Sequence, residues 1–300
     1  MLHILLLTLG LAGQAAPAAP PIPAEYQPVL TFLNRQGDFA DNVFRINIPR
    51  NDLKVTVAGV ATPTPFGFGG WLAMTKGTGG DVMMGDLVLQ QDEVAPVMSA
   101  LLDNGLEVTA LHNHFYWEEP RLAYMHVHGH GDPMDLARRV KPELDLIGKG
   151  APPAAAAPAG AALPPALDGA KLAAIVGTAG VQTGAVYKIT LARPDLKITE
   201  MGAPINSRMG LNTWASFVGT NDKAAIAGDV AMLESEVTPV LKALRKNGLD
   251  VVALHHHMTE DRPMIIFLHY WGTGPADKLA TGFKAAVNEL GKHGAATSSR

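Results

Sequence analysis

Short runs in which apolar and polar residues alternate recur along the chain. Such runs predict β-strands, because successive side chains on a strand point to opposite faces of a sheet. In the first half of the chain they cover residues 43–48, 53–60, 70–75, 82–90, 107–115 and 122–128. Residues 94–102 follow a different period, with apolar side chains every three or four positions, and predict an amphipathic helix.

Three helices are predicted in this half. The first covers residues 26–33, and the second follows the acidic pair at 92–93 and ends at Gly105. The third begins at Asp132-Pro133, a capping residue followed by proline, and continues to about residue 147. Strand, helix, strand, strand, helix is the order of a ferredoxin-like unit. We therefore expect an α+β fold with an antiparallel or mixed sheet and helices packed on one face.

The same pattern returns later in the chain at a constant offset of 143 residues, without a gap. Matching positions include Phe44-Arg45-Ile46 with Tyr187-Lys188-Ile189, Trp71 with Trp214, Gly85-Asp86 with Gly228-Asp229, and Ala110-Leu111-His112 with Ala253-Leu254-His255. So many matches at one offset indicate a duplication. We expect two tandem ferredoxin-like repeats that pair with each other within the chain.

The predicted organisation has five parts. The first repeat covers residues 24–149 and the second covers 167–292, with an Ala/Pro-rich linker at 150–166 and a disordered tail at 293–300. Residues 1–23 resemble a secretory signal peptide with a trailing segment, because a short apolar run at 4–12 precedes small residues. That run is too short to span a bilayer. We expect an exported protein, periplasmic or secreted, with no transmembrane segment.

Composition excludes several classes of function. The formal net charge is −4 and no Lys/Arg-rich run occurs, so there is no basic face for nucleic acid. The chain has no cysteine, which excludes disulfides, thiolate nucleophiles, cysteine-based zinc sites and a lipid-anchoring lipobox. Nucleophile-elbow, H-E-x-x-H and P-loop patterns are also absent. A metal would therefore need imidazole, methionine or carboxylate ligands.

Histidine carries the candidate chemistry, because most of the 11 histidines gather in two short windows. At the repeat offset His112 matches His255, His114 matches His257, and His126 matches His269. Alternate residues on a strand share a face, so an H-x-H pair points one way. If residues 107–115 and 122–128 form a hairpin, their histidines converge.

Three or four such nitrogen and oxygen ligands suit a divalent transition metal such as zinc, copper, nickel or iron. The candidate ligands of the first repeat are His112, His114, His126, His128 and Glu118; the weaker set of the second repeat is His255, His257 and His269. The first set is richer because Trp271 stands where the first repeat has His128. A hydrogen-bonded network of structural histidines is the alternative.

Other positions support weaker hypotheses. Glu118 or Glu119 would move protons if the centre were catalytic. Trp71 and Trp214 are expected to pack in the core, or to form an aromatic wall beside the site. Arg50 forms a surface ion pair rather than an anion site on this interpretation.

Several segments together resemble the LppY/LpqO family, also known as domain of unknown function 1259. They include Thr109-Ala110-Leu111-His112-Asn113-His114, Tyr124-Met125-His126-Val127-His128-Gly129-His130, Ala253-Leu254-His255-His256-His257 and Phe267-Leu268-His269-Tyr270-Trp271. The resemblance covers nearly the whole chain after the leader and implies an exported protein. It implies no activity, and the chain departs from lipoprotein members in lacking the lipobox cysteine.

The sequence thus predicts an exported protein that binds a transition metal or small ligand through a histidine cluster in each repeat. Two alternatives remain open. One is a metal-dependent enzyme, hydrolytic or oxidative. The other is a module that binds a small polar ligand without a metal.

Overall fold

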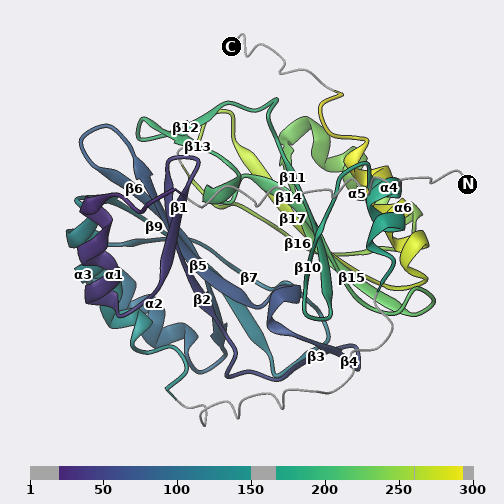
Figure 1. The fold of residues 1–300 in the computed structure, drawn as a ribbon, viewed down its shortest axis with the longest axis horizontal. Helices are drawn as coiled ribbons and strands as arrows, with labels where there is room; N and C mark the ends of the chain where they lie inside the picture. Colours follow the sequence, from purple (N-terminus) through teal and green to yellow (C-terminus); the bar gives the residue numbers. More distant parts are fainter. Residues whose placement is uncertain (1–19, 150–166, 260, 293–300) are drawn as a thin grey trace, which may run out of the picture.

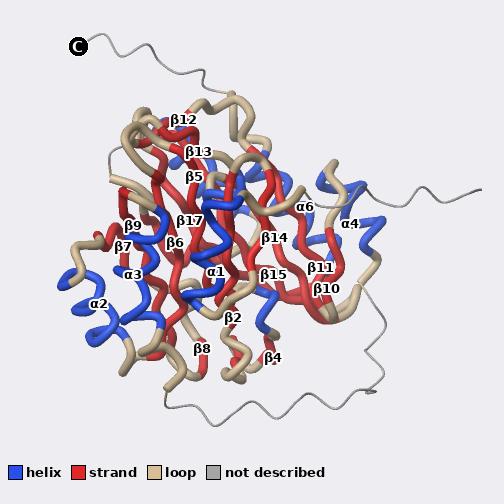
Figure 2. Tube along the Cα trace, turned by 60° about the vertical axis from the view of Figure 1, so that its left-hand side comes forward, coloured by secondary structure: helices blue, strands red, loops and turns tan. Residues whose placement is uncertain are grey.

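The computed structural model describes residues 20–149, 167–259 and 261–292. The two repeats form two six-stranded sheets that face each other, and the helices cover the outer faces (Figures 1 and 2). The predicted linker and tail, and all but the last residues of the predicted signal segment, lie outside the described residues. None of the helices in the described part of the chain combines the length and apolar character needed to cross a membrane.

The first repeat contains three α-helices among its strands. In chain order its main elements are α1 (Gln27–Leu33), β1 (Gly37–Ala40), β2 (Val43–Pro49), β3 (Val55–Val57), β4 (Val60–Thr62), β5 (Gly69–Lys76), β6 (Asp81–Gln90), α2 (Val94–Asp103), β7 (Glu107–His112), β8 (Glu118–Glu119), β9 (Leu122–Gly131) and α3 (Pro133–Leu144). The main sheet has the order β1-β2-β5-β6-β9-β7, and every neighbouring pair is antiparallel.

The second repeat has the same plan. Its elements are α4 (Gly169–Val176), β10 (Val181–Thr183), β11 (Val186–Ala192), β12 (Ile198–Glu200), β13 (Ala203–Ile205), β14 (Asn212–Gly219), β15 (Ala224–Leu233), α5 (Glu234–Lys246), β16 (Asp250–His255), β17 (Ile265–Gly274) and α6 (Ala276–Val287). Its sheet order is β10-β11-β14-β15-β17-β16. The structure confirms the predicted α+β class, the antiparallel sheets and the two similar halves.

The ferredoxin-like part of each repeat explains how the histidines meet. In the first repeat the chain runs β6, α2, β7, β9, α3, and β9 inserts between β6 and β7. This arrangement is the split β-α-β motif. It sets His126 of β9 opposite Asp86 on one side and Ala110 on the other. His112, two residues beyond Ala110, is therefore a diagonal neighbour of His126 on the same face.

Two local features differ from the sequence prediction. The single strand expected at 53–60 is a hairpin of β3 and β4, because Ala58 and Gly59 turn the chain with φ of 48° and 78°. Strand β1 was not predicted, since Gly37–Ala40 contains only one large apolar residue and shows no alternation.

The β3–β4 and β12–β13 hairpins reach across to the opposite repeat (Figure 1). Val55 and Val57 of β3 belong to an apolar cluster with Ala227 and Trp271 of the second sheet. Ile198 and Ile205 of β12 and β13 pack in the same manner with Val82 and Met84 of the first sheet. Each repeat therefore covers part of the other's inner face, while separate cores fill the space between each sheet and its helices.

Candidate functional site

Six histidines, three from each repeat, converge between the two sheets. The ring centroids of His112 and His255 lie 3.8 Å apart, and those of His114 and His269 lie 3.6 Å apart. The symmetry-related contact, His126 with His257, is 4.2 Å. The structure thus brings together all six histidines that match at the repeat offset, in one shared cluster (termed the six-histidine cluster).

Ligand atoms within this cluster are close enough to hold a metal ion. Three groups have their donor atoms within 4.8 Å of one another: His112, His114 and His269; His112, His126 and His255; and Asp229, His255 and His257. Two of these groups draw on both repeats. The sequence suggests one site in each repeat; the third group lies within the second repeat, whereas the first two combine ligands of both repeats. The first and third groups share no residue, so two ions could bind at once.

Backbone hydrogen bonds orient two of the rings. His269 Nδ1 lies 3.1 Å from the carbonyl oxygen of Gly228, and His126 is bonded to the equivalent carbonyl of Gly85. A ring nitrogen that donates to a carbonyl leaves the other nitrogen, Nε2, with its lone pair free for a metal. Glycine is required at 228 because a Cβ there would meet the Trp214 carbonyl oxygen at 2.0 Å.

Most other imidazole nitrogens of the cluster are buried and lack hydrogen-bond partners among the described residues. The atoms concerned are both ring nitrogens of His112, His114 and His255, Nε2 of His126 and His269, and Nδ1 of His257. Buried polar atoms are rarely left unbonded, because each costs about 1–3 kcal/mol. Burial also lowers the pKa of His126 and of His269 to about 3, so both rings are neutral. Neutral imidazole is the form that coordinates metals.

Two aspartates complete the cluster, and the sequence reasoning did not identify them as site residues. Asp229 Oδ2 lies 3.7 Å from His257 Nε2, and Asp86 occupies the equivalent position in the first repeat. Burial raises the pKa of Asp86 to about 8 and that of Asp229 well above its usual value. The available signal was the match of Gly85-Asp86 with Gly228-Asp229.

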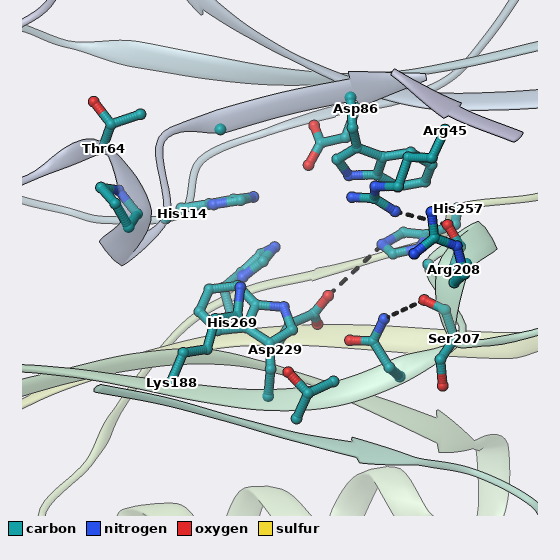
Figure 3. Close-up of a pocket in the computed structure, with 18 residues that line it drawn as sticks. Arg45, Thr64, Asp86, His114, Lys188, Ser207, Arg208, Asp229, His257 and His269 are labelled. Atoms are coloured by element: carbon teal, nitrogen blue, oxygen red, sulfur yellow. Dashed lines mark hydrogen bonds and ion pairs between the residues drawn. The ribbon is translucent and has the colours of Figure 1, made fainter. Parts of the chain in front are cut away.

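A cavity of about 390 Å³ adjoins the cluster. Figure 3 shows Asp86 and Arg45 on one wall and Asp229 and Lys188 on the facing wall. The lining of the cavity also includes His114, His257, His269, Gly69, Trp71 and Trp214. Both tryptophans border the cavity, as the second of their expected roles requires, and Trp71 also packs in a buried apolar cluster, as the first requires.

The other predicted site residues lie apart from the six-histidine cluster. His128 Nε2 is 3.4 Å from Glu200 Oε1 of the second repeat, and both side chains are buried. Glu118 Oε1 accepts a hydrogen bond from the Leu122 amide at 3.2 Å, and burial raises its pKa to about 7. Glu119 is exposed. Within the described chain none of these three joins the groups of convergent ligand atoms.

The donor set fits a transition metal. Imidazole nitrogens with a carboxylate suit zinc, copper, nickel or iron, whereas calcium and magnesium prefer oxygen ligands throughout. The buried nitrogens without partners are the observation that favours an ion over a hydrogen-bonded network, because a network would have satisfied them.

The fold and side chains define a tandem α+β protein with a histidine-lined centre between its repeats. The chain belongs to the family described as Domain of Unknown Function (DUF1259), which matches residues 27–146 and again 170–289. The two matched regions coincide with the two structural repeats. No curated protein matches the chain.

Some solved structures show distant likeness. EtuB from Clostridium kluyveri is 11% identical, with 89% of this chain and 93% of that chain covered and a TM-score of 0.21. The double ringed trimeric shell protein MSM0271 from the RMM microcompartment is 12% identical, with 72% and 84% covered and a TM-score of 0.18. The trimeric bacterial microcompartment shell protein PduB is 9% identical, with 82% and 86% covered and a TM-score of 0.19. At these TM-scores the likeness carries no argument about this chain.

Proposed function

We propose that this protein binds divalent transition metal ions in a centre shared by its two repeats. The observation that carries the proposal is the set of buried imidazole nitrogens without partners in the six-histidine cluster. One ion would lie between His112, His114 and His269, and a second between His255, His257 and Asp229. We extend the proposal to an exported protein, periplasmic or secreted, on the basis of the apolar run at residues 4–12.

Elemental analysis of protein purified without a histidine tag tests the proposal. We expect one to two equivalents of zinc, copper, nickel or iron per chain after metal-supplemented refolding. Less than about 0.1 equivalent would overturn it. His112→Ala combined with His114→Ala should remove the ion of the first group and leave the ion of the second. His130→Ala is the matched control, because His130 contacts the Thr78 carbonyl oxygen instead of the cluster.

The cavity favours a second candidate, a metal-dependent enzyme. His114, His269 and Asp229 belong both to the ligand groups and to the cavity lining, so a bound ion would face an open space. An open coordination position is typical of catalytic metal sites, whereas structural sites are closed. Spectroscopy of the cobalt-substituted protein distinguishes them: a five-coordinate spectrum that changes with added azide supports the enzyme, and an invariant tetrahedral spectrum excludes it.

A further inference from the structure

Two cations line the cavity at equivalent positions of the two repeats. The Arg45 guanidinium lies 4.2 Å from the ring centre of Trp71, and Lys188 Nζ lies 4.0 Å from that of Trp214. Arg45 Nη1 donates to the Arg208 carbonyl oxygen at 2.7 Å. In the described part of the chain no carboxylate lies within 4.0 Å of either cationic group.

Asp86 is the acidic group that attracts Arg45, and Asp229 is the one that attracts Lys188, but burial raises the pKa of both carboxyls and so weakens this counter-charge near neutral pH. Both side chains are partly buried, and withdrawing an unpaired charge from water costs free energy. Burial, together with the positive charge of Arg45, lowers the pKa of Lys188 to about 8. Two cations held on indole rings on facing walls of a cavity therefore form a preorganised site for negative charge.

We infer that the cavity binds a small organic anion, with its carboxylate or phosphate group between Arg45 and Lys188. The planar guanidinium matches the paired oxygens of such groups. Trp71 and Trp214 provide apolar surface for the rest of the ligand. The volume of about 390 Å³ lies near the lower end of ligand pockets, which are roughly 300–1,000 Å³, and limits the ligand to a small molecule.

The inference rests in part on the proposed metal centre. Asp86 and Asp229 line the same cavity and would repel an anion if they were charged. Asp229 also belongs to a ligand group, so a metal ion would offset this repulsion. Anion affinity should therefore be higher in metal-loaded protein than in metal-free protein.

Gly69 offers a test with a matched control. It lines the cavity, and a Cβ added there would meet nothing within 4 Å. Asn212 occupies the equivalent position of the second repeat, so a side chain of this size fits the fold. Gly69→Asp places a negative charge in the cavity, and Gly69→Asn has the same shape without the charge.

Isothermal titration calorimetry at low ionic strength, with benzoate and inorganic phosphate as separate probes, measures binding to full-length protein. We expect at least one probe to bind and Gly69→Asp to weaken it at least tenfold relative to Gly69→Asn. Lys188→Met should weaken it similarly, while Lys278→Met on the exposed face of α6 should not. The probe that binds distinguishes a carboxylate ligand from a phosphate ligand.

Two results would overturn the inference: no binding of either probe to metal-loaded and metal-free protein, or equal binding by Gly69→Asp and Gly69→Asn. Metal analysis of the same samples separates the two proposals. Absence of metal with charge-sensitive anion binding would refute only the metal centre. If the Lys188→Met variant keeps its full metal content but loses anion binding, both the metal centre and the anion site are supported.

Discussion

The imidazole rings of His112 and His255 stack across the boundary between the repeats, with 3.8 Å between centroids and 15° between planes. These two residues occupy the same position in their respective repeats, so an approximate twofold axis passes between them. The other contacts repeat under exchange of the halves: His112 with His269 and His126 with His255 are both 5.2 Å. The cluster is therefore a property of the paired repeats, and neither repeat contains it alone.

One consequence concerns metal binding across the boundary. His114 lies in the first repeat and His269 in the second, yet both belong to one ligand group. We expect His114→Ala and His269→Ala each to remove the same single equivalent of metal, and the double variant to lose no more than either single variant. Elemental analysis after exposure to a chelator measures this. Additive losses would show that the two histidines serve separate ions.

A second prediction concerns the buried ion pairs that brace each repeat. Arg50 donates to Asp52 at 2.7 Å and to Glu93 at 2.6 Å, and Arg193 forms the equivalent bonds in the second repeat. Because removing one partner leaves a buried charge uncompensated, Arg50→Met should lower the free energy of unfolding by about 3 kcal/mol. Urea denaturation measures the change.

The control for this variant is Arg138→Met, on the exposed side of α3. It should change stability by less than about 0.5 kcal/mol. A similar effect of both substitutions would mean that the buried ion pair contributes little.

Local periodicity was enough to predict most elements and half of the cluster. The spacing of His112, His114 and His126 placed them on one face of a hairpin, and β7 and β9 form that hairpin. The fixed offset then extended the result to the second repeat. Arg50 was expected in an ion pair at the surface; the pair exists, but it is buried beneath the start of α2.

Contacts between the repeats could not be read from periodicity. Alternation along a strand shows which side chains share a face of the sheet. It does not show which distant surface that face packs against. For this reason His128 looked like a fourth ligand, although the β12 hairpin brings Glu200 against it. The cavity was not predicted either. Arg45 and Lys188 match at the repeat offset, but a basic residue in a strand does not by itself indicate a cavity.

A third prediction concerns the contact between His128 and Glu200, which is replaced by an apolar contact at the equivalent positions. At the equivalent positions the structure has Trp271 and Val57, which belong to one apolar cluster. Glu200→Val alone should destabilise the protein by about 2 kcal/mol, because it removes one charged partner of the buried His128, whose Nδ1 also lies 3.7 Å from Glu107 Oε2. His128→Trp combined with Glu200→Val installs the apolar pair and should recover at least about 1 kcal/mol of that loss. Thermal or urea unfolding of the four proteins completes the cycle, and strict additivity would contradict the prediction.

A fourth prediction concerns Glu143, a carboxyl group of α3 that is completely buried. Neither of its oxygens has a hydrogen-bond partner among the described residues, and the second repeat has Ala286 at this position. Burial raises its pKa from 4.5 to about 7. The folded state therefore holds the proton more tightly than the unfolded state, and stability is lost as the pH rises from about 4.5 to about 7.

Glu143→Gln keeps the shape of the neutral acid and removes this titration. The variant should match the wild-type protein near pH 4.5 and exceed its free energy of unfolding by on the order of 1–3 kcal/mol at pH 8. Urea denaturation at the two pH values gives the difference directly. Glu234→Gln, at an exposed acid at the start of α5, is the control and should change stability by less than about 0.5 kcal/mol at either pH. An equal effect of Glu143→Gln at both pH values would show that the carboxyl has the same pKa in the folded and unfolded states, because only a difference between these two pKa values makes its contribution to stability depend on pH.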